Sequence, residues 1–324
     1  MFGLDKVKLV MDMDDVEVLN EDVFEKRVVE GEILGLTFEQ QTPFLLKIKI
    51  DYNQGEAVVE FTGKALLSEY HNLIRLNNIR VAIDNINAIG VCCINNYMSA
   101  EVVKVDCTID VHCPYVRGIS DFINSNLSSY RKYIGRYLDN GNFIVDKNVT
   151  TKQCKKRLTV YNKFIEMEKA KHRKFLKKYY DGENPFVHNN CRFELNLTSK
   201  EQIRSSLHIE NTKLKNVLLS AQNVNPIYDF LNKVICEDAT SVVQGSRIND
   251  YYTALVLKDC DYDIKKVEAK LRMYYSKGTK MRFVLKRYRQ MLSTMNDKRG
   301  ERDAILSLVK TKTQITQRMK FEYL

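Results

Sequence analysis

The sequence predicts an α+β fold, with an antiparallel sheet in the body of the molecule and a helical, basic region after it. Between residues 44 and 197, several segments alternate polar and apolar residues, which is typical of strands with one face on a core. Further along the chain, apolar residues recur every three or four positions, as they do on helices. We therefore assign residues 1–210 to a strand-rich domain and residues 211–324 to a helical region.

The composition excludes an integral membrane protein. Of the 324 residues 44% are hydrophobic, which is enough for a packed core, yet no apolar run approaches the ~20 residues that a membrane helix needs. The N-terminal segment has no basic stretch before an apolar one, so we expect no cleaved signal peptide, a cytoplasmic location and no membrane partner. The eight cysteines contain the adjacent pair Cys92 and Cys93 but no C-x-x-C spacing, which favours reduced structural thiols over a zinc site.

The first predicted strands form a hairpin. Residues 44–50 (FLLKIKI) and 57–63 (AVVEFTG) both alternate, and Asn53-Gln54-Gly55 supplies the turn between them. A longer strand is predicted at residues 102–112. One of its faces is apolar, and the other carries Asp106, Thr108, Asp110 and His112.

Two helices and three further strands follow along the chain. Residues 119–138 place apolar residues three or four apart and are predicted as one helix. Residues 142–148 and 156–164 are predicted as a strand pair, and a basic helix then runs to about Tyr179. Residues 191–197 (CRFELNL) form the last predicted strand.

Two helices are predicted in the C-terminal region, at residues 263–275 and from about residue 280 to residue 295. The second helix directs five cations outward: Lys280, Arg282, Lys286, Arg287 and Arg289. This arrangement is compatible with a helix-turn-helix-like arm, and a plain solvated helical hairpin fits the pattern equally well.

The charge distribution suggests a phosphate backbone as a partner. Residues 251–324 hold the whole net charge of +10, and residues 152–178 form a second basic region. Two separate basic regions on a protein with a packed core are typical of nucleic-acid binding. A solvated cationic surface remains the alternative reading.

The polar faces of the predicted strands are the candidate site. If the apolar side of the sheet packs on helices, ionisable groups converge on the other side, namely Asp106, Arg157, Tyr161, Lys163, Arg192 and Glu194, with Glu60 in the hairpin. Such a set suits metal-dependent phosphoryl transfer, in which carboxylates hold a hard cation, cations neutralise the phosphate and a hydroxyl attacks. An ordinary solvated sheet face shows the same alternation. The sequence lacks the phosphate-binding loop of NTPases, the dinucleotide fingerprint, and the H-E-x-x-H and G-x-S-x-G motifs.

Four stretches, in this order and approximate spacing, resemble the core of the filamentous-phage gene II/X replication initiators: FLLKIKI with VVEFTGKALL, VVKVDCTIDV, RLTVYNKFIEME and CRFELNLTSKEQIRSSL. Their Tyr-x-Lys and Arg-x-Glu themes are also similar to those of rolling-circle plasmid initiators. The resemblance covers roughly residues 44–210 and does not place residues 1–43 or 211–250. It implies a body like that of nicking endonucleases, in an enzyme that cuts one strand at a replication origin and later rejoins the displaced strand.

The resemblance also implies roles for individual residues. Tyr161 corresponds to the nucleophile that forms a 5′-phosphotyrosine bond and leaves a free 3′-OH, and Lys163 would favour its phenolate. Asp106 and Glu194, with Glu60 less closely matched, correspond to acids that would hold Mg²⁺ or Mn²⁺.

The expected partners are the origin duplex and a single DNA strand. The residues expected to contact DNA are Arg157, Arg192, Lys174, Lys177, Lys178 and the cations of the second C-terminal helix. Phe175, Tyr179 and Tyr180 are candidates for stacking on bases. A host helicase and polymerase, in a bacterial cytoplasm if a phage or plasmid encodes the chain, are candidate further partners.

Three other functions stay open from the sequence. The first is a DNA-binding regulator of the same fold that binds an origin without catalysis. A tyrosine recombinase would need a cluster of Arg and His leading to a C-terminal tyrosine, and Tyr323 lacks that set. RNA binding is compatible with the charge alone.

Overall fold

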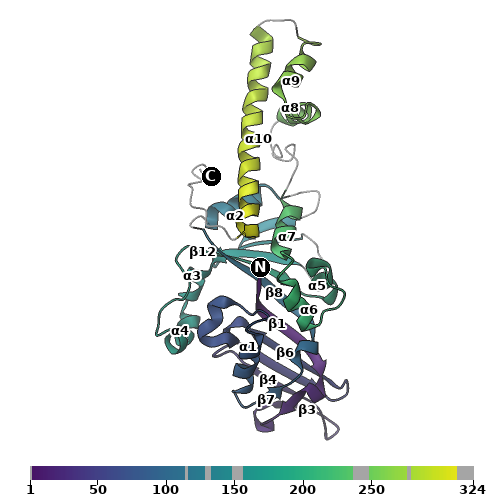
Figure 1. Cartoon of the computed structure of the whole chain (residues 1–324), viewed down its shortest axis with the longest axis vertical. Helices are drawn as coiled ribbons and strands as arrows, with labels where there is room; N and C mark the ends of the chain where they lie inside the picture. Colours follow the sequence, from purple (N-terminus) through teal and green to yellow (C-terminus); the bar gives the residue numbers. More distant parts are fainter. Residues whose placement is uncertain are drawn as a thin grey trace.

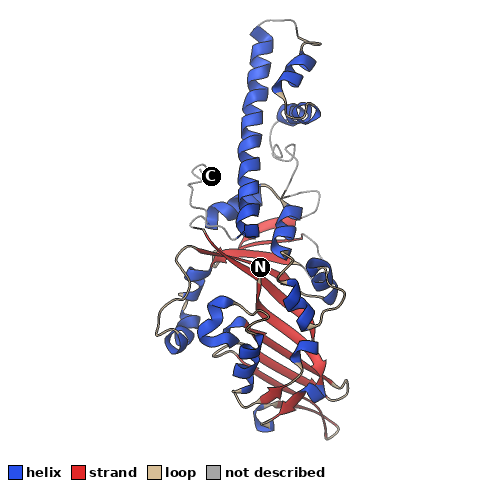
Figure 2. Ribbon diagram, in the orientation of Figure 1, coloured by secondary structure: helices blue, strands red, loops and turns tan. Residues whose placement is uncertain are grey.

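The protein has an α+β architecture, as predicted, in which a large antiparallel sheet carries helices (Figure 2). The computed structural model describes residues 2–113, 116–127, 133–147, 156–235, 248–275 and 279–311. None of the described cysteines forms a disulfide.

The N-terminal strand lies in the centre of the sheet. The ten strands described follow the order β3 (Glu25–Val29), β4 (Glu32–Gln40), β5 (Leu46–Asp51), β6 (Glu56–Thr62), β1 (Gly3–Asp12), β8 (Glu101–His112), β12 (Asn190–Leu197), β11 (Arg157–Asn162), β10 (Phe143–Lys147) and β9 (Tyr133–Tyr137). All neighbouring pairs are antiparallel. A second, two-stranded sheet pairs β2 (Val16–Val18) with β7 (Cys92–Ile94). The first strand therefore joins the predicted hairpin to the strands that carry the candidate site.

The predicted strands are confirmed as β5, β6, β8, β10, β11 and β12, but the single helix predicted over residues 119–138 is wrong. Helix α2 spans Val116–Ser125, and Tyr133–Tyr137 forms strand β9 on the edge of the sheet. Its glycine, Gly135, lies so close to the Phe143 ring that an added Cβ would come within 2.7 Å of it. Pairing with β10 and this close approach outweigh the helical spacing of the apolar residues.

Helices cover the apolar face of the sheet. They are α1 (Ile79–Asn87), α2, α5 (Lys200–Leu207), α6 (Leu214–Ser220) and α7 (Pro226–Val234). Val105, Cys107 and Ile109 of β8 are fully buried in this main core, on the face where the alternation placed them. Because α6 and α7 belong to the same core, the strand-rich body extends beyond the boundary that we placed at residue 210.

The C-terminal helices form an arm. Helix α10 (Thr279–Thr311) projects from the body, and α8 (Ile248–Asp259) and α9 (Ile264–Leu271) lie beside its far end (Figure 1). The arm has its own small core, which includes Leu257, Val267 and Leu285. At its other end, α10 buries Ile305 and Val309 in the main core and packs on α7. The second predicted helix is thus confirmed but is much longer than expected, and no described helix is long and apolar enough to cross a membrane.

Short helices close over the polar face of the central strands. They are the 3-10 helix η3 (Gly63–Asn72), α3 (Lys163–Met167), the 3-10 helix η6 (Ala170–His172) and α4 (Arg173–Tyr179). The predicted strand at residues 156–164 stops at Asn162, whose side chain accepts a hydrogen bond from the Ile165 amide and so begins α3. A small satellite core holds these helices together through Tyr70, Met167, Phe175, Leu176 and Phe186.

Candidate active site

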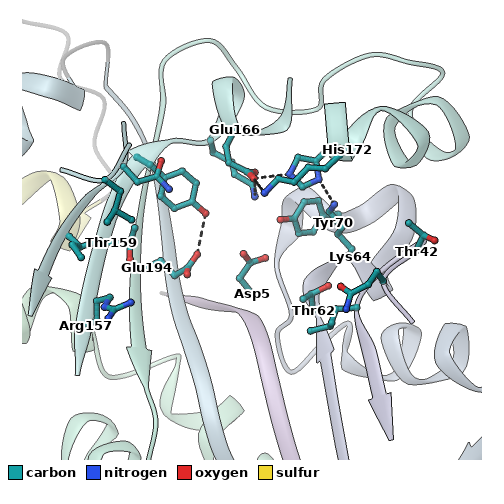
Figure 3. A pocket seen from close by; sticks show the side chains of 18 residues that line it. Asp5, Thr42, Thr62, Lys64, Tyr70, Arg157, Thr159, Glu166, His172 and Glu194 are labelled. Atoms are coloured by element: carbon teal, nitrogen blue, oxygen red, sulfur yellow. Dashed lines mark hydrogen bonds and ion pairs between the residues drawn. The ribbon is translucent and has the colours of Figure 1, made fainter. Parts of the chain in front are cut away.

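A cavity of about 620 Å³ lies between the polar face of the sheet and the short helices (Figure 3). Strands β1, β6, β10, β11 and β12 line one side of the cavity, and η3, α3 and η6 line the other. The charged or hydroxyl-bearing side chains that line it are Asp5, Thr42, Thr62, Lys64, Tyr70, Arg157, Thr159, Tyr161, Lys163, Glu166, Lys171, His172 and Glu194.

The strand register brings the predicted polar groups together. Three cross-strand rows run over β8, β12 and β11: Asp106, Asn196 and Arg157; Thr108, Glu194 and Thr159; Asp110, Arg192 and Tyr161. Side chains of paired residues share one face of a sheet. The predicted convergence of the three polar faces is therefore confirmed.

Tyr161 is bonded to Glu194 at the floor of the cavity. Its hydroxyl donates to Glu194 Oε2 at 3.1 Å, and the tyrosine is only 8% exposed. Burial, with the negative charge of Glu194, raises the pKa of Tyr161 well above its usual value of 10. The phenol is therefore protonated in the free protein, and the carboxyl group of Glu194 is in place to accept its proton once that group is ionised.

Glu194 is a perturbed carboxyl. Burial, followed by the nearby charges of Asp106 and Asp5, raises its pKa to about 8. A carboxyl with such a pKa holds a proton at neutral pH until a bound cation or alkaline conditions remove it. Functional sites are where carboxyls of this kind are concentrated.

Asp5 is one of the cavity residues that the sequence analysis missed, together with Lys64, Glu166 and His172. The β1–β8 register shifts between Leu4 and Lys6, so Asp5 occupies a bulge, a device that re-aims side chains beside active sites. Burial alone would raise the pKa of Asp5, but the charges of Arg192 and Lys163 lower it overall. Its Oδ1 atom is buried without a hydrogen-bond partner among the described residues, and the carboxylate lies in the middle of the cavity (Figure 3). The signal for Asp5 in the sequence is that Asp5 and Lys6 are adjacent polar residues, which interrupt the alternation of polar and apolar residues in this strand.

The metal-ligand prediction changes in two of its three residues. Glu60 pairs with Lys6 Nζ at 2.5 Å and does not line the cavity. Asp106 accepts a hydrogen bond from the Asn196 amide and also lies outside the cavity wall. Of the three predicted acids, only Glu194 lines the cavity.

Asp5 and Glu194 are the carboxylates that fit Mg²⁺ or Mn²⁺. Within the described part of the chain, no three His, Cys, Asp or Glu side chains form a ready-made metal cage. Mg²⁺ commonly uses one or two carboxylates and takes its other ligands from water and substrate phosphate. The unpartnered oxygen of Asp5 and the raised pKa of Glu194 suit such a site.

Lys163 lies beside Tyr161 but does not bond its hydroxyl. It is almost fully buried, and its Nζ lies 5.9 Å from the centre of the Tyr161 ring. Its ion pair is with Glu166 Oε2, at 3.2 Å. The observed hydrogen-bond partner of the phenol is therefore Glu194 and not Lys163.

Arg192 cannot contact DNA as predicted, because its side chain has no exposed surface. Nε and Nη2 donate to the two carboxylate oxygens of Asp110 at 2.7 Å each, and Nη1 donates to Asp5 Oδ2 at 3.1 Å. The guanidinium group of Arg192 therefore holds the Asp5 carboxylate in place. Arg157, in contrast, is exposed and lines the cavity.

The predicted basic helix borders a second cavity of about 270 Å³, which shares Lys64 and Lys171 with the first. Lys174, Lys177 and Lys178 are exposed on α4, and the first and last of these line the second cavity. The three aromatics expected to stack on bases lie in different surroundings. Phe175 is buried in the satellite core, and the hydroxyl of Tyr180 donates to the Leu67 carbonyl. Tyr179 lines the second cavity.

The arm presents most of its predicted cations to solvent. Lys280, Arg282, Lys286 and Arg289 are exposed on α10. Arg287 is half-buried and pairs with Asp250 of α8 at 2.6 Å. Four of the five cations are therefore accessible on the surface of the arm.

Replacing Glu194 with glutamine should flatten the pH dependence of stability. An unfolded glutamate titrates near pH ~4.3, whereas folded Glu194 titrates near 8. Between these values the folded state binds the extra proton, so rising pH reduces the stability that Glu194 contributes. We expect the free energy of unfolding of the metal-free protein to fall less between pH 5 and pH 9 in Glu194→Gln than in the wild type, measured by urea denaturation. Asp106→Asn is the matched control: the pKa of Asp106 is raised by burial to about 6, so its effect should end near that pH.

The cavity thus combines two half-buried carboxyl groups, those of Asp5 and Glu194, with the hydroxyl of Tyr161 and a wall that carries lysines and a histidine. Comparison of the chain with protein-family models, curated proteins and solved structures finds no match.

Proposed function

We propose that the chain is a metal-dependent enzyme that nicks and rejoins one strand of DNA at a replication origin. The observation that carries this proposal is the Tyr161 hydroxyl, bonded to Glu194 at 3.1 Å in a polar cavity. A nucleophile with a proton acceptor in hydrogen-bond contact is the signature of covalent catalysis. The resemblance of the strand segments to rolling-circle initiators supports the same chemistry.

In this mechanism the Tyr161 oxygen attacks the scissile phosphorus, and Glu194 accepts the phenolic proton. A bond forms between phosphorus and the tyrosine oxygen, and the bond to the 3′ oxygen breaks. The products are a 5′-phosphotyrosine and a strand that ends in a 3′-OH. Because the covalent bond conserves the energy of the phosphodiester, the reverse attack can rejoin a strand without ATP.

The charges around the cavity suit a phosphodiester. Lys163, Lys171 and Arg157 line it, and each places a positive charge near the negative phosphate. When bound by Asp5 and Glu194, Mg²⁺ or Mn²⁺ would neutralise charge that develops on the phosphate oxygens. Arg192 would keep Asp5 ionised and oriented for that purpose.

A single strand is the substrate form that fits the cavity best. Tyr161 is nearly buried at its floor, beneath η3 and α3, so a phosphate must enter a recess to reach it. An extended strand or an extruded loop can do so more readily than the backbone of a rigid duplex. The neighbouring cavity, with Lys174, Lys178 and Tyr179, offers a continuation for the same strand.

The exposed cations of α10 would bind the duplex beside the nick site. We expect the triple variant Arg282→Gln, Lys286→Gln and Arg289→Gln to reduce the slope of log affinity against log salt by up to about 3, with a similar loss on every duplex sequence. Fluorescence anisotropy over a salt series measures this. The control is the triple variant Lys26→Gln, Lys47→Gln and Lys49→Gln, which removes three positive charges from strands β3 and β5, far from the arm. Each of these lysines has a partly exposed side chain and pairs with an acid. Equal slopes in the two triple variants would contradict a role for the arm.

Adduct formation tests the proposed function. The protein is incubated with Mn²⁺ or Mg²⁺ and labelled single strands tiled from the genetic element that encodes it, then denatured and resolved on a gel. We expect one strand to yield a denaturation-resistant protein–DNA adduct that disappears with EDTA. Specific binding with no adduct under any metal would instead support the non-catalytic origin-binding regulator.

A further inference from the structure

Three side chains on the wall opposite Glu194 form a hydrogen-bonded chain that the proposed attack does not use. His172 Nε2 lies 2.7 Å from Glu166 Oε1, and His172 Nδ1 lies 2.6 Å from Lys64 Nζ. The His172 and Glu166 side chains are only 10% and 12% exposed, and all three residues line the main cavity. Lys64, from η3, is therefore the end of a chain that begins on α3.

The chain fixes the protonation of its members. Glu166 accepts only, so His172 carries its proton on Nε2 and presents the bare Nδ1 to Lys64. Burial is the largest influence on the pKa of His172, which is lowered, and the imidazole is neutral. The ammonium of Lys64 thus donates to His172 and keeps its remaining protons for the cavity. Lys163 and Lys171 hold the Glu166 carboxylate at 3.2 Å and 2.9 Å.

The position of Lys64 matches that of a leaving group. In phosphoryl transfer, the attacking and leaving oxygens lie roughly in line on opposite sides of phosphorus. Glu194, the partner of the attacking hydroxyl, lies on one side of Asp5, and Lys64 and His172 lie on the other (Figure 3). A phosphate above Asp5 would have its departing 3′ oxygen on the Lys64 side.

The surroundings of Lys64 also suit proton transfer. Burial, with the charge of Lys163, lowers its pKa to about 8, against the opposing effects of Glu166 and Asp5. The charge of Lys171 contributes to the same lowering of the pKa, and His172 is the hydrogen-bond partner of Lys64. A general acid is most effective when its pKa is near the working pH.

We propose that Lys64 is the general acid that protonates the leaving 3′ oxygen, with His172 and Glu166 as its positioning residues. The inference rests on the proposed function. During cleavage the tyrosine proton passes to Glu194, the P–O3′ bond breaks, and a proton of Lys64 passes to the 3′ oxygen. During joining, the Lys64 amine takes the proton from the attacking 3′-OH and Glu194 returns one to Tyr161.

A sulfur substitution tests this role directly. Strands with a sulfur in place of the 3′ bridging oxygen have a leaving thiolate, which needs no proton because a thiol has a pKa of ~8.5. We expect Lys64→Met to slow adduct formation about 10²–10⁴-fold on the ordinary strand and only a few-fold on the sulfur strand. Equal slowing on both strands would overturn the inference and leave Lys64 a binding residue.

The wild-type protein provides a test that needs no variant. If Lys64 is the acid, the rate on the ordinary strand declines above about pH 8, and this alkaline decline is absent on the sulfur strand. Glu166→Gln removes a charge that raises the pKa of Lys64, so the decline should move to lower pH on the ordinary strand alone. Identical pH profiles for the two strands would exclude general-acid catalysis by Lys64.

The failures of the two proposals are distinguishable. If the wild type forms an adduct with neither strand, the proposed nicking function fails. If it forms an adduct with both strands, and the variant and pH tests show no difference between them, only the role of Lys64 fails.

Discussion

Replacing Tyr161 with phenylalanine is expected to abolish the covalent protein–DNA adduct while the protein still folds and binds DNA. The variant removes the attacking oxygen, and loss of a covalent nucleophile reduces rates by far more than 10³-fold, up to about 10⁶-fold. The ring stays in place, so the structural cost is the hydrogen bond to Glu194, about 1–3 kcal/mol of unfolding free energy. Adduct yield on the active strand, thermal unfolding and anisotropy with the same strand measure the three properties.

Two further tyrosines provide controls for this variant. Tyr70→Phe changes a buried tyrosine that lines the same cavity, and Tyr52→Phe changes one that is 42% exposed and does not line it. Both variants should retain the adduct. An adduct that persists in Tyr161→Phe and is lost in Tyr70→Phe would move the nucleophile to Tyr70 and refute our assignment.

Replacing Arg192 with methionine is expected to be the most destabilising single change at the site. The variant leaves Asp110 and Asp5, whose side chains are only 20% and 15% exposed, without their cation, and breaking a buried ion pair in this way costs about 3–5 kcal/mol. The loss should appear in urea denaturation near neutral pH. Because Arg192 is the main charge that lowers the pKa of Asp5, the variant that remains folded should also bind Mn²⁺ more weakly.

The controls for Arg192→Met separate burial from charge. Arg80→Met removes an arginine whose side chain is 84% exposed and pairs with Asp84 at 3.7 Å, so it should cost less than about 1 kcal/mol. Adding Asp110→Asn to Arg192→Met removes one stranded carboxylate and should restore part of the lost stability. A cost for Arg192→Met no larger than that for Arg80→Met would show that the buried network does not stabilise the fold.

The sequence was sufficient to place Tyr161 and Glu194 on one face of the sheet, because alternation with period two is a local property of each strand. It was not sufficient to distinguish a cavity wall from its surroundings. Asp106 and Glu60 satisfy the same alternation, yet each is held by its own neighbour, Asn196 or Lys6, outside the cavity. Arg192 also lies on the predicted face of its strand. Its complete burial, however, depends on Asp5 and Asp110, which belong to strands far away in the chain.

The β9 segment shows the same limit in the fold. Residues 133–137 fit a helical spacing when read alone, and only the partner strand β10 and the ring of Phe143 explain why they are extended. The reverse holds for the predicted hairpin and for α10, in which the local pattern and the long-range packing agree.

The sequence by itself determined the α+β class, six of the strands, the polar face that carries Tyr161 and Glu194, and the basic C-terminal helices, because each follows from the periodicity of neighbouring residues. The tertiary structure decided the rest of the site. It placed Asp5 in a bulge at the centre of the sheet, buried Arg192 beneath it, and brought Lys64 to His172 across more than a hundred residues of chain. These placements depend on contacts between distant segments, whose pairing and depth no local pattern specifies.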